Sequence, residues 1–193
     1  SCRQDDINAL MVSLAKGGKR VVRLKSGDPL VFGRAGEEID ACREAGIPVT
    51  VVPGVTAAQG AAASLGISLT HRDAARRLQY VTGHDRRGTL PDDLNWAALA
   101  DPTVTTVIYM PKRTLRALLA QAITQGLPPA TPALVVFNAT RPDQAVVQAT
   151  ACDLADKVEA AGLEGPAIVM VGDALGRGER EAVVTEALAS AAH

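Results

Sequence analysis

Residues 23–34, RLKSGDPLVFGR, stand where a buried strand is expected to end and a ligand-binding turn to begin. The preceding Val21 and Val22 open an apolar, β-branched run that is typical of a buried strand. Gly27 and Pro29 prevent a strand or a helix from continuing, which leaves Asp28 at the carboxyl end of that strand. In an open parallel sheet, ligands bind at this edge. The stretch therefore predicts an α/β fold with a candidate site at Asp28, although Gly-Asp-Pro is also ordinary turn chemistry.

A second turn of the same kind follows one unit later. Residues 51–57, VVPGVTA, again place a glycine turn between an expected strand and the start of a helix. Two such turns on adjacent strands can face one ligand. The helix start at Thr56 and Ala57 offers N–H groups to a carboxylate, and Asp28 offers an acceptor to a hydroxyl or ammonium group. Together these groups suit an amino acid or a nucleoside.

Expected strands and helices alternate along the chain, which predicts an α/β fold with mostly parallel sheets. We expect residues 1–77 to form a partial N-terminal α/β domain and residues 78–193 a C-terminal α/β domain. The first domain starts on a helix and has only two clear strands, so we infer that residues upstream of Ser1 are missing. The expected strands are 20–25, 47–52, 78–82, 104–110, 133–137, 145–149 and 167–171, and the expected helices are 5–16, 36–45, 57–65, 114–125, 154–161 and 180–191.

The composition excludes several classes of function. With 193 residues, 47% of them hydrophobic, the chain can fill a core. Its apolar runs are far shorter than the roughly 20 residues that a membrane span needs. A net charge of −1 disfavours a duplex DNA binder, and an aromatic content of 3% leaves few stacking platforms for single strands. We therefore expect neither a membrane nor a nucleic-acid partner.

The cysteines indicate the compartment. Cys2, Cys42 and Cys152 match no metal-binding or disulfide spacing, and no targeting segment opens the chain. We expect a cytoplasmic protein without a metal.

One basic stretch interrupts an otherwise neutral chain. Residues 71–87, named here the basic island, carry five arginines and two histidines against two aspartates. Arginine binds carboxylates better than lysine does, and the island suits a small polyanion. Each histidine opens a loop and can equally hydrogen-bond the backbone, as each arginine can be solvated surface. The basic residues are His71, Arg72, Arg76, Arg77, His84, Arg86 and Arg87.

Five runs in order resemble one known family. They are RLKSGDPLVFGRAGEE (residues 23–38), VVPGVTAA (51–58), ISLTHR (67–72), VTGH (81–84) and VIYM (107–110). In order and spacing these runs resemble the uroporphyrinogen III C-methyltransferases, which belong to the S-adenosylmethionine-dependent tetrapyrrole methylases. The resemblance covers nearly the whole chain.

The resemblance implies two α/β domains with the cofactor in the cleft between them, and a homodimer. It implies two methyl transfers from S-adenosylmethionine, at C2 and C7 of uroporphyrinogen III, which give precorrin-2 for sirohaem and cobalamin synthesis and leave S-adenosylhomocysteine. Carboxylates of the substrate would bind Arg72, His71 and Arg86. The residues that match the family's cofactor contacts are Ser26, Gly27, Asp28, Val31, Thr56, Ala57, Met110 and Ala139.

Two of these positions depart from the family pattern. Ser26 and Ala139 replace glycines. Ser26 adds only a small hydroxyl, whereas Ala139 would be costly if its position needed a positive φ.

The family's acid/base groups lie outside this sequence. Its glycine-rich first turn, its Asp and its Lys would all stand before Ser1, so no catalytic residue is assigned in this chain. We therefore expect the polypeptide alone to be a poor catalyst.

Three alternatives remain. The chain can be the C-terminal part of a bifunctional sirohaem synthase, or a cofactor-binding module without activity. A nicotinamide enzyme is disfavoured, because the sequence has no Gly-x-Gly-x-x-Gly turn.

Overall fold

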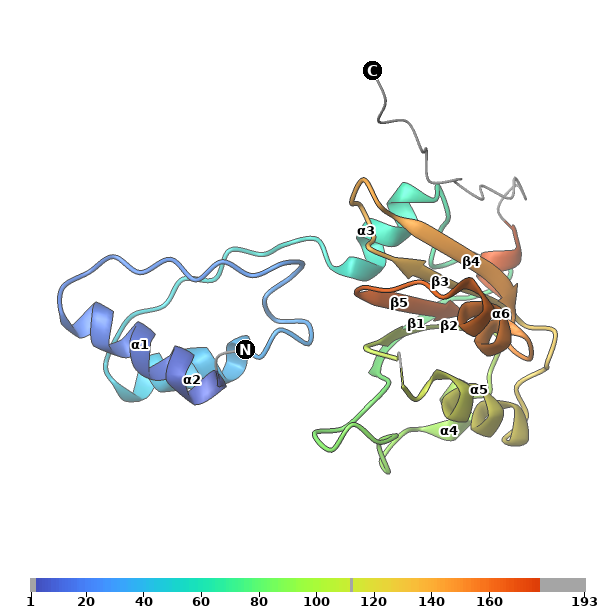
Figure 1. Cartoon of the computed structure of the whole chain (residues 1–193), viewed down its shortest axis with the longest axis horizontal. Coiled ribbons are helices and arrows are strands. Elements are labelled where there is room, and N and C mark those ends of the chain that lie inside the picture. Colours follow the sequence, from blue (N-terminus) through green and yellow to red (C-terminus); the bar gives the residue numbers. More distant parts are fainter. Residues whose placement is uncertain (1–2, 112, 178–193) are drawn as a thin grey trace, which may run out of the picture. The chain divides into compact units, whose positions relative to one another are not determined.

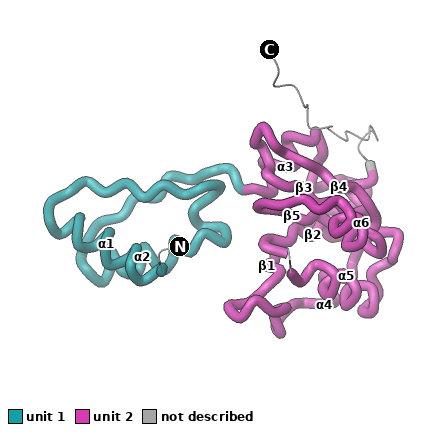
Figure 2. Tube along the Cα trace, viewed as in Figure 1, with its two compact units in different colours: residues 1–56 teal, residues 57–193 magenta. Residues whose placement is uncertain are grey.

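The structure is a computed structural model that describes residues 3–111 and 113–177. Contacts divide the chain into two compact units, residues 1–56 and 57–193, which Figure 2 colours separately. Each unit has its own packing and is taken by itself. The helix expected over residues 180–191 and the side chain of Cys2 lie outside the described residues.

Two helices form the regular structure of the first unit. Helices α1 (Gln4–Lys16) and α2 (Ala35–Glu44) pack against each other (Figure 1). Each helix has acidic residues in its first turn and a basic residue in its last turn, which complements the helix dipole. Gly17 caps α1, and Gly46, with a φ of 72°, follows α2. The predicted helices 5–16 and 36–45 are therefore confirmed.

The prediction of two strands in the first unit is wrong. Residues 20–25 and 47–52 have no strand hydrogen bonding in the structure. Their apolar side chains are largely in solvent: Val22 is 72% exposed, Leu24 81% and Val52 77%. A β-branched run favours an extended chain, but a strand also needs a partner for its backbone groups. The described part of the first unit contains no such partner.

A buried carboxylate, and not a neighbouring strand, holds residues 23–25 in place. Glu38 in α2 is 4% exposed and accepts hydrogen bonds from Gln4 Nε2 at 3.0 Å and Arg23 Nε at 3.1 Å on one oxygen. Its other oxygen accepts one from Lys25 Nζ at 2.8 Å. Burial alone would raise the pKa of Glu38, but the hydrogen bonds from Lys25, Gln4 and Arg23 outweigh it and lower the pKa below 4.5. Glu38 thus ties residues 23–25 to both helices.

One five-stranded sheet forms the centre of the second unit (Figure 1). The strand order is β1-β2-β5-β3-β4. β1 and β2 are parallel, whereas β2–β5, β5–β3 and β3–β4 are antiparallel. The strands are β1 (Arg77–Thr82), β2 (Val104–Tyr109), β3 (Pro132–Phe137), β4 (Ala145–Thr150) and β5 (Ala167–Val171).

This mixed α/β sheet corrects the expectation of mostly parallel sheets. β3 and β4 form a hairpin, because residues 138–144 are too few for the crossover that a parallel pair requires. β5 is inserted between β2 and β3 and is antiparallel to both. The alternation of helices and strands was predicted from the sequence, and all five strands form close to their expected positions.

Helices cover both faces of this sheet. Alternate residues of β3 point to opposite faces, so Val135 packs with α5 (Leu115–Thr124) and α6 (Leu154–Ala161). Val136 packs on the other face with α3 (Ala57–Ser64), through the alanines of that helix. Because both faces are buried, the central strands β3 and β5 are apolar throughout, and β2 is apolar except for the buried Thr105 and Thr106. A short helix, α4 (Trp96–Leu99), precedes β2, and a 3₁₀ helix spans Asp173–Arg177.

The compact units and the predicted domains divide the chain at different points. Contacts separate the units after Thr56, because α3 packs on the sheet of the second unit. The predicted boundary between residues 77 and 78 falls at the start of β1. It stays a prediction.

Replacing Glu38 with Gln should weaken the first unit. The amide cannot keep all three charge-assisted hydrogen bonds, so we expect a loss of about 1–3 kcal/mol in the free energy of opening of residues 4–44. Hydrogen-exchange mass spectrometry of peptides from this region measures that loss. Glu37→Gln is the matched control, because Glu37 is exposed and its ion pair with Arg34 should contribute little.

The same carboxylate predicts an acid dependence. Because the pKa of Glu38 is lower in the folded than in the unfolded chain, its stabilisation is present above the unfolded pKa and is lost as pH falls through the folded pKa. The E38Q variant should lack this part of the acid destabilisation. Equal acid sensitivity in the wild type and in E38Q would contradict this role of Glu38.

Candidate functional site

The two glycine turns of the first unit are joined by Asp28. Its Oδ1 accepts a hydrogen bond from Leu30 N at 2.8 Å, and its Oδ2 accepts one from Gly54 N at 3.0 Å. The N–H groups of Gly54 and Leu30 lower the pKa of Asp28 below its usual value of 3.8, so the carboxylate stays charged. The two turns therefore meet, although the strands on which they were expected to face one ligand do not form. Asp28 was expected to be a free acceptor, but both its oxygens already serve the protein, and only their second lone pairs remain.

The glycines of these turns are required by close packing. Gly27 has a φ of 73°, which suits a residue without Cβ. A Cβ on Gly54 would lie 2.3 Å from the carbonyl oxygen of Gly27. The backbones of the two turns are thus in direct contact. Five predicted cofactor residues belong to this unit: Ser26, Gly27, Asp28 and Val31 lie in or beside the first turn, and the buried Thr56 closes the second.

One edge of the sheet gathers the other predicted cofactor residues. β1, β2 and β3 run in the same direction, so their carboxyl ends share that edge. Met110 follows β2 and Ala139 follows β3. The start of α3 reaches the same edge, because Ala58 N donates to Tyr109 Oη at 3.4 Å. Ala57, Met110 and Ala139 therefore belong to one group.

The backbone at this edge adopts conformations that are rare without glycine. Met110, Asn138 and Thr140 have φ values of 54°, 48° and 64°. Such residues cluster at functional sites in proteins. Ala139 itself is not in the left-handed region, so its replacement of the family's glycine brings no strain of this kind.

Hydrogen bonds fix the loop around Ala139. Thr140 N donates to Gln144 Oε1 at 2.7 Å, and Asn138 Nδ2 donates to Asp143 Oδ2 at 2.9 Å. Within the described residues, the backbone N–H groups of Met110 and Ala139 have no hydrogen-bond partner. This edge therefore offers fixed, unpaired donors to a ligand. The sequence signal that was missed is Asn138, a residue type that tolerates the left-handed region.

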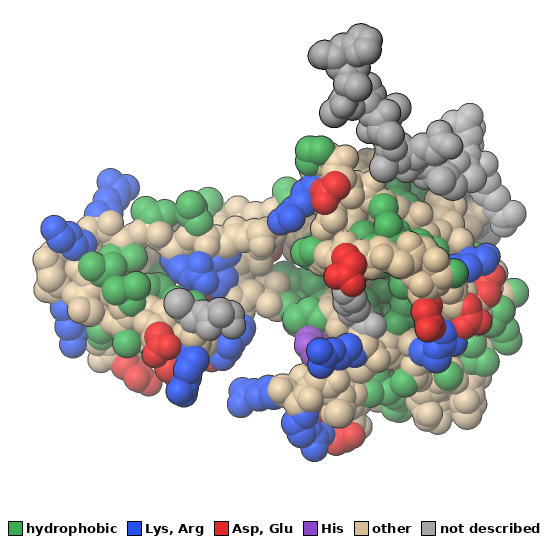
Figure 3. All heavy atoms as spheres, viewed as in Figure 1, with side chains coloured by type: hydrophobic (Ala, Val, Ile, Leu, Met, Phe, Trp, Pro, Cys, Tyr) green, Lys and Arg blue, Asp and Glu red, His purple; other side chains and the backbone are tan. Residues whose placement is uncertain are grey.

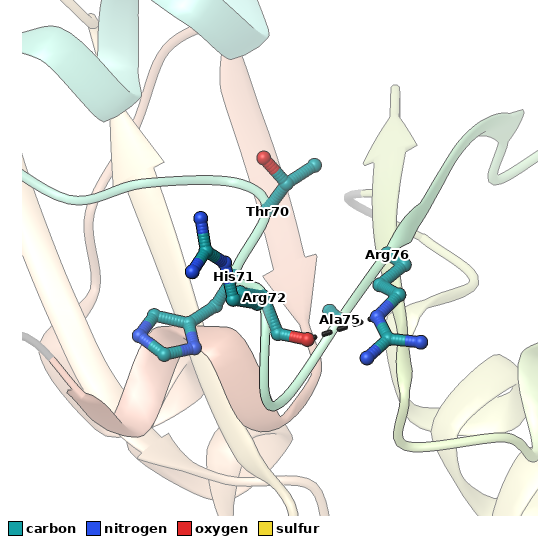
Figure 4. A pocket seen from close by; sticks show the side chains of 5 residues that line it. All are labelled: Thr70, His71, Arg72, Ala75 and Arg76. Atoms are coloured by element: carbon teal, nitrogen blue, oxygen red, sulfur yellow. Dashed lines mark hydrogen bonds between the residues drawn. The ribbon is translucent and has the colours of Figure 1, made fainter.

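Part of the basic island lines an open pocket of about 300 Å³ (Figure 4). The lining residues belong to a turn of the main chain. His71 and Ala75 close this turn, and their backbones exchange hydrogen bonds of 2.7 and 2.9 Å. Arg76 Nε donates to the carbonyl of Arg72 at 2.9 Å, and the two guanidinium groups point away from each other (Figure 4). The lining residues are Thr70, His71, Arg72, Ala75 and Arg76.

Carboxylates of the protein neutralise two other arginines of the island, Arg77 and Arg87. Lys and Arg side chains lie beside acidic ones on the visible face of the second unit (Figure 3). Arg77 pairs with Asp101, and Arg87 Nε lies 2.7 Å from Asp85 Oδ2. The hydrogen bond from Arg87 lowers the pKa of Asp85 to about 2. These two arginines are therefore structural.

The remaining arginines keep their charge unpaired. Within the described part of the chain, no ion pair neutralises Arg72, Arg76 or Arg86. His71 and Arg72 both line the pocket, whereas Arg86 lies beyond the other end of β1 and is not among the lining residues. A large polyanion with several carboxylates suits such separate positive groups.

The structure also bears on metals and membranes. No three His, Cys, Asp or Glu side chains among the described residues come close enough together to hold a metal ion. Over the same residues, no helix combines the length and the apolar character that a membrane crossing requires.

Comparison with known proteins gives a consistent result. The profile of the tetrapyrrole (corrin/porphyrin) methylases matches residues 2–155. The siroheme synthase of Methylococcus capsulatus is 48% identical over 176 residues, which are 91% of this chain and 37% of the relative. That of Gluconacetobacter diazotrophicus is 51% identical over 183 residues, 94% of this chain and 38% of the relative. The chain thus spans under two fifths of the length of these relatives.

Solved structures agree with the sequence relatives. The uroporphyrin-III C-methyl transferase of Thermus thermophilus, complexed with S-adenosylhomocysteine, is similar at a TM-score of 0.77 and 34% identity. The similarity covers 90% of this chain and 74% of that one. A cobalt precorrin-4 methyltransferase is similar at a TM-score of 0.80 and 28% identity, over 91% of this chain and 73% of the other.

Replacing Gly54 with Ala should separate the joined turns. The new methyl group would lie 2.3 Å from the Gly27 carbonyl oxygen, so the backbone must shift and the hydrogen bond to Asp28 weakens. We expect the free energy of opening of the two turns to fall by about 1–3 kcal/mol. Faster hydrogen exchange in peptides covering residues 23–34 and 51–56 would report it.

Gly36→Ala is the matched control for this substitution. Gly36 lies in α2, and a Cβ there would meet nothing within 4 Å. Alanine should be neutral or stabilising by about 0.5–1 kcal/mol in a helix. If G54A exchanged as slowly as G36A, the contact between the turns would not matter.

Proposed function

Since the chain belongs to the family of tetrapyrrole (corrin/porphyrin) methylases, we propose that it binds S-adenosylmethionine and uroporphyrinogen III for C-methylation at C2 and C7, giving precorrin-2. The observation that carries this proposal is that the predicted cofactor residues gather in two groups, one in each unit. Asp28 joins the turns of the first group, and the carboxyl ends of β2 and β3 bring the second together. A related transferase has been solved with S-adenosylhomocysteine, which supports the donor.

The residues present fit such a donor. Ser26, Gly27 and Ala57 are exposed to solvent, and Met110, 47% exposed, leaves apolar surface for a nucleoside. The unpaired N–H groups at Met110 and Ala139 suit the polar atoms of an adenosyl group or of an amino-acid tail. When bound, the donor supplies an electrophilic methyl group on sulfur.

This chain's own part in the reaction is binding and orientation. Holding the acceptor carbon in line with the sulfonium supplies much of the rate gain in such a transfer. Arg72 and Arg86 carry unpaired positive charge for the carboxylates of the macrocycle, and His71 stands beside Arg72. The residues that would move protons in the family are not among those assigned here.

A second proposal concerns the parent protein. The relatives are named siroheme synthase, and the chain covers 37–38% of the first two. Both facts support the proposal that this chain is part of a bifunctional sirohaem synthase and not a monofunctional methyltransferase. The sequence encoded on either side of this chain tests it: a dehydrogenase-like domain supports the bifunctional protein, and a methylase alone contradicts it.

Binding of S-adenosylhomocysteine tests the proposed function directly. Titration calorimetry of the purified chain should detect binding of S-adenosylhomocysteine and no binding of NAD⁺. Binding of NAD⁺ alone would favour a nicotinamide enzyme. We also propose a homodimer, on the family likeness, and a cytoplasmic location, on the spacing of the cysteines. Light scattering of the purified chain measures the first of these.

Replacing Arg72 with Ala should weaken substrate binding selectively. A charge-assisted hydrogen bond is lost, so the dissociation constant or KM for uroporphyrinogen III should rise about tenfold or more. Affinity for S-adenosylhomocysteine should be unchanged. Arg116→Ala is the matched control, because Arg116 is paired with Asp156 and Glu159 on the surface of the second unit. Weaker cofactor binding with an unchanged KM for the tetrapyrrole would overturn the assignment.

A further inference from the structure

The pocket of the basic island contains an arginine that has no assigned ligand so far. Arg76 lines this pocket together with Arg72, and its side chain is exposed to solvent. Asp73 is the acidic residue of the same turn, and within the described residues it forms no ion pair with either arginine. A ligand can therefore reach a positive charge at Arg76 that the described part of the protein does not neutralise.

One nitrogen of Arg76 holds the side chain in place. Its Nε donates a hydrogen bond to the carbonyl of Arg72 at 2.9 Å, across the turn that His71 and Ala75 close. The two terminal nitrogens of the guanidinium group donate to no described residue. A guanidinium group presents its donors in a fixed, planar arrangement that matches a carboxylate. Arg76 thus combines a fixed position with donors that are left for another molecule.

The two arginines of the pocket face different directions. The side chain of Arg72 lies beside His71, whereas Arg76 projects from the opposite side of the turn (Figure 4). Their guanidinium groups point away from each other, so one carboxylate is badly placed to bind both of them. The turn therefore suits a ligand that brings two separate carboxylates.

His71 adds a donor on the side of Arg72. Its Nδ1 accepts a hydrogen bond from Asp73 N at 3.1 Å. A ring nitrogen that accepts a hydrogen bond carries no proton, so the N–H donor of this imidazole is Nε2. His71 and Arg72 thus form one group of donors, and Arg76 forms the second.

We propose that Arg72 and Arg76 bind two different carboxylates of the same tetrapyrrole, which makes Arg76 a second anchor for the substrate. This inference rests on the proposed function. Uroporphyrinogen III carries carboxylates around its whole rim, so one edge of the macrocycle can present two of them to this turn. A single anchor leaves the macrocycle free to pivot, whereas two separate anchors also fix its orientation. The carboxylate of the cofactor is another source of the same chemistry, and the experiment separates the two.

Replacing Arg76 with Gln removes the charge and keeps the turn. The amide nitrogen of glutamine is as many bonds from the backbone as Nε of arginine, so it can still donate to the carbonyl of Arg72. R76Q should weaken binding of uroporphyrinogen III about tenfold and leave the affinity for S-adenosylhomocysteine unchanged. Anaerobic titration measures the first affinity, and calorimetry measures the second.

Arg77→Gln is the matched control. It removes the same charge from the neighbouring residue, whose guanidinium group already pairs with Asp101. R77Q should stay within about threefold of the wild type in its affinity for uroporphyrinogen III. An equal loss in R77Q and R76Q would reduce the effect to the overall charge of the chain and overturn the contact.

A double variant shows whether two carboxylates are bound. If Arg72 and Arg76 bind separate carboxylates, the losses in R72A and R76Q should multiply to about a hundredfold. A double variant that binds as well as the weaker single variant would indicate one shared carboxylate and overturn the proposal.

The remaining outcomes separate the contact from a structural role and from the proposed function. Hydrogen exchange over residues 70–77 should be as slow in R76Q as in the wild type and faster in R76A, which lacks the bond to Arg72. Full tetrapyrrole affinity in R76Q with a loss in R76A, or faster exchange in both, would attribute the effect to the turn and overturn the contact. Weaker S-adenosylhomocysteine binding by R76Q would assign Arg76 to the cofactor and overturn it too. A wild-type chain that binds neither ligand would instead refute the proposed function.

Discussion

In the first unit, the buried Glu38 fixes an extended segment that would be held by hydrogen bonds to a neighbouring strand in a sheet. Residues 23–25 have no strand partner among the described residues, and they lead directly into the turn of Asp28. Their position is set by Arg23 and Lys25, whose side chains end on one buried carboxylate of α2. From there the order is passed on, because Asp28 fixes Gly54. The candidate cofactor turns are therefore only as well defined as this ion cluster.

The second unit achieves the same end by different means. Its central strands β2, β5 and β3 are buried on both faces, and the carboxyl ends of β1, β2 and β3 lie at one edge because β5 enters between β2 and β3 in the opposite direction. The alanine-rich face of α3 lets that helix approach closely: a Cβ on Gly60 would lie 3.2 Å from Thr140 Cγ2. The fold thus brings Ala57 to the edge where Met110 and Ala139 lie. Packing rather than charge builds this group.

The sequence predicted most of the helices and the strands of the sheet, because hydrophobic periodicity reports burial. The prediction failed at residues 20–25 and 47–52, because their apolar pattern fits a strand but the described residues supply no neighbouring strand for their backbone groups. It also failed on the direction of β5, since periodicity does not record which strands are neighbours. Within the site, the sequence predicted two turns but placed them on strands that do not form, and it missed that Asp28 serves the protein itself. The left-handed Asn138 depends on tertiary contacts that a local pattern does not contain.

The hydrogen bond from Gly54 to Asp28 joins residues that are 26 positions apart in the sequence. Closing a loop of this length has an entropic cost that grows with the logarithm of its length, and in this chain the fold has met that cost before any ligand arrives. A ligand that contacts both turns therefore has no loop to close, so more of its contact energy can appear as affinity. In this sense the Asp28–Gly54 bond is a preorganising cross-link.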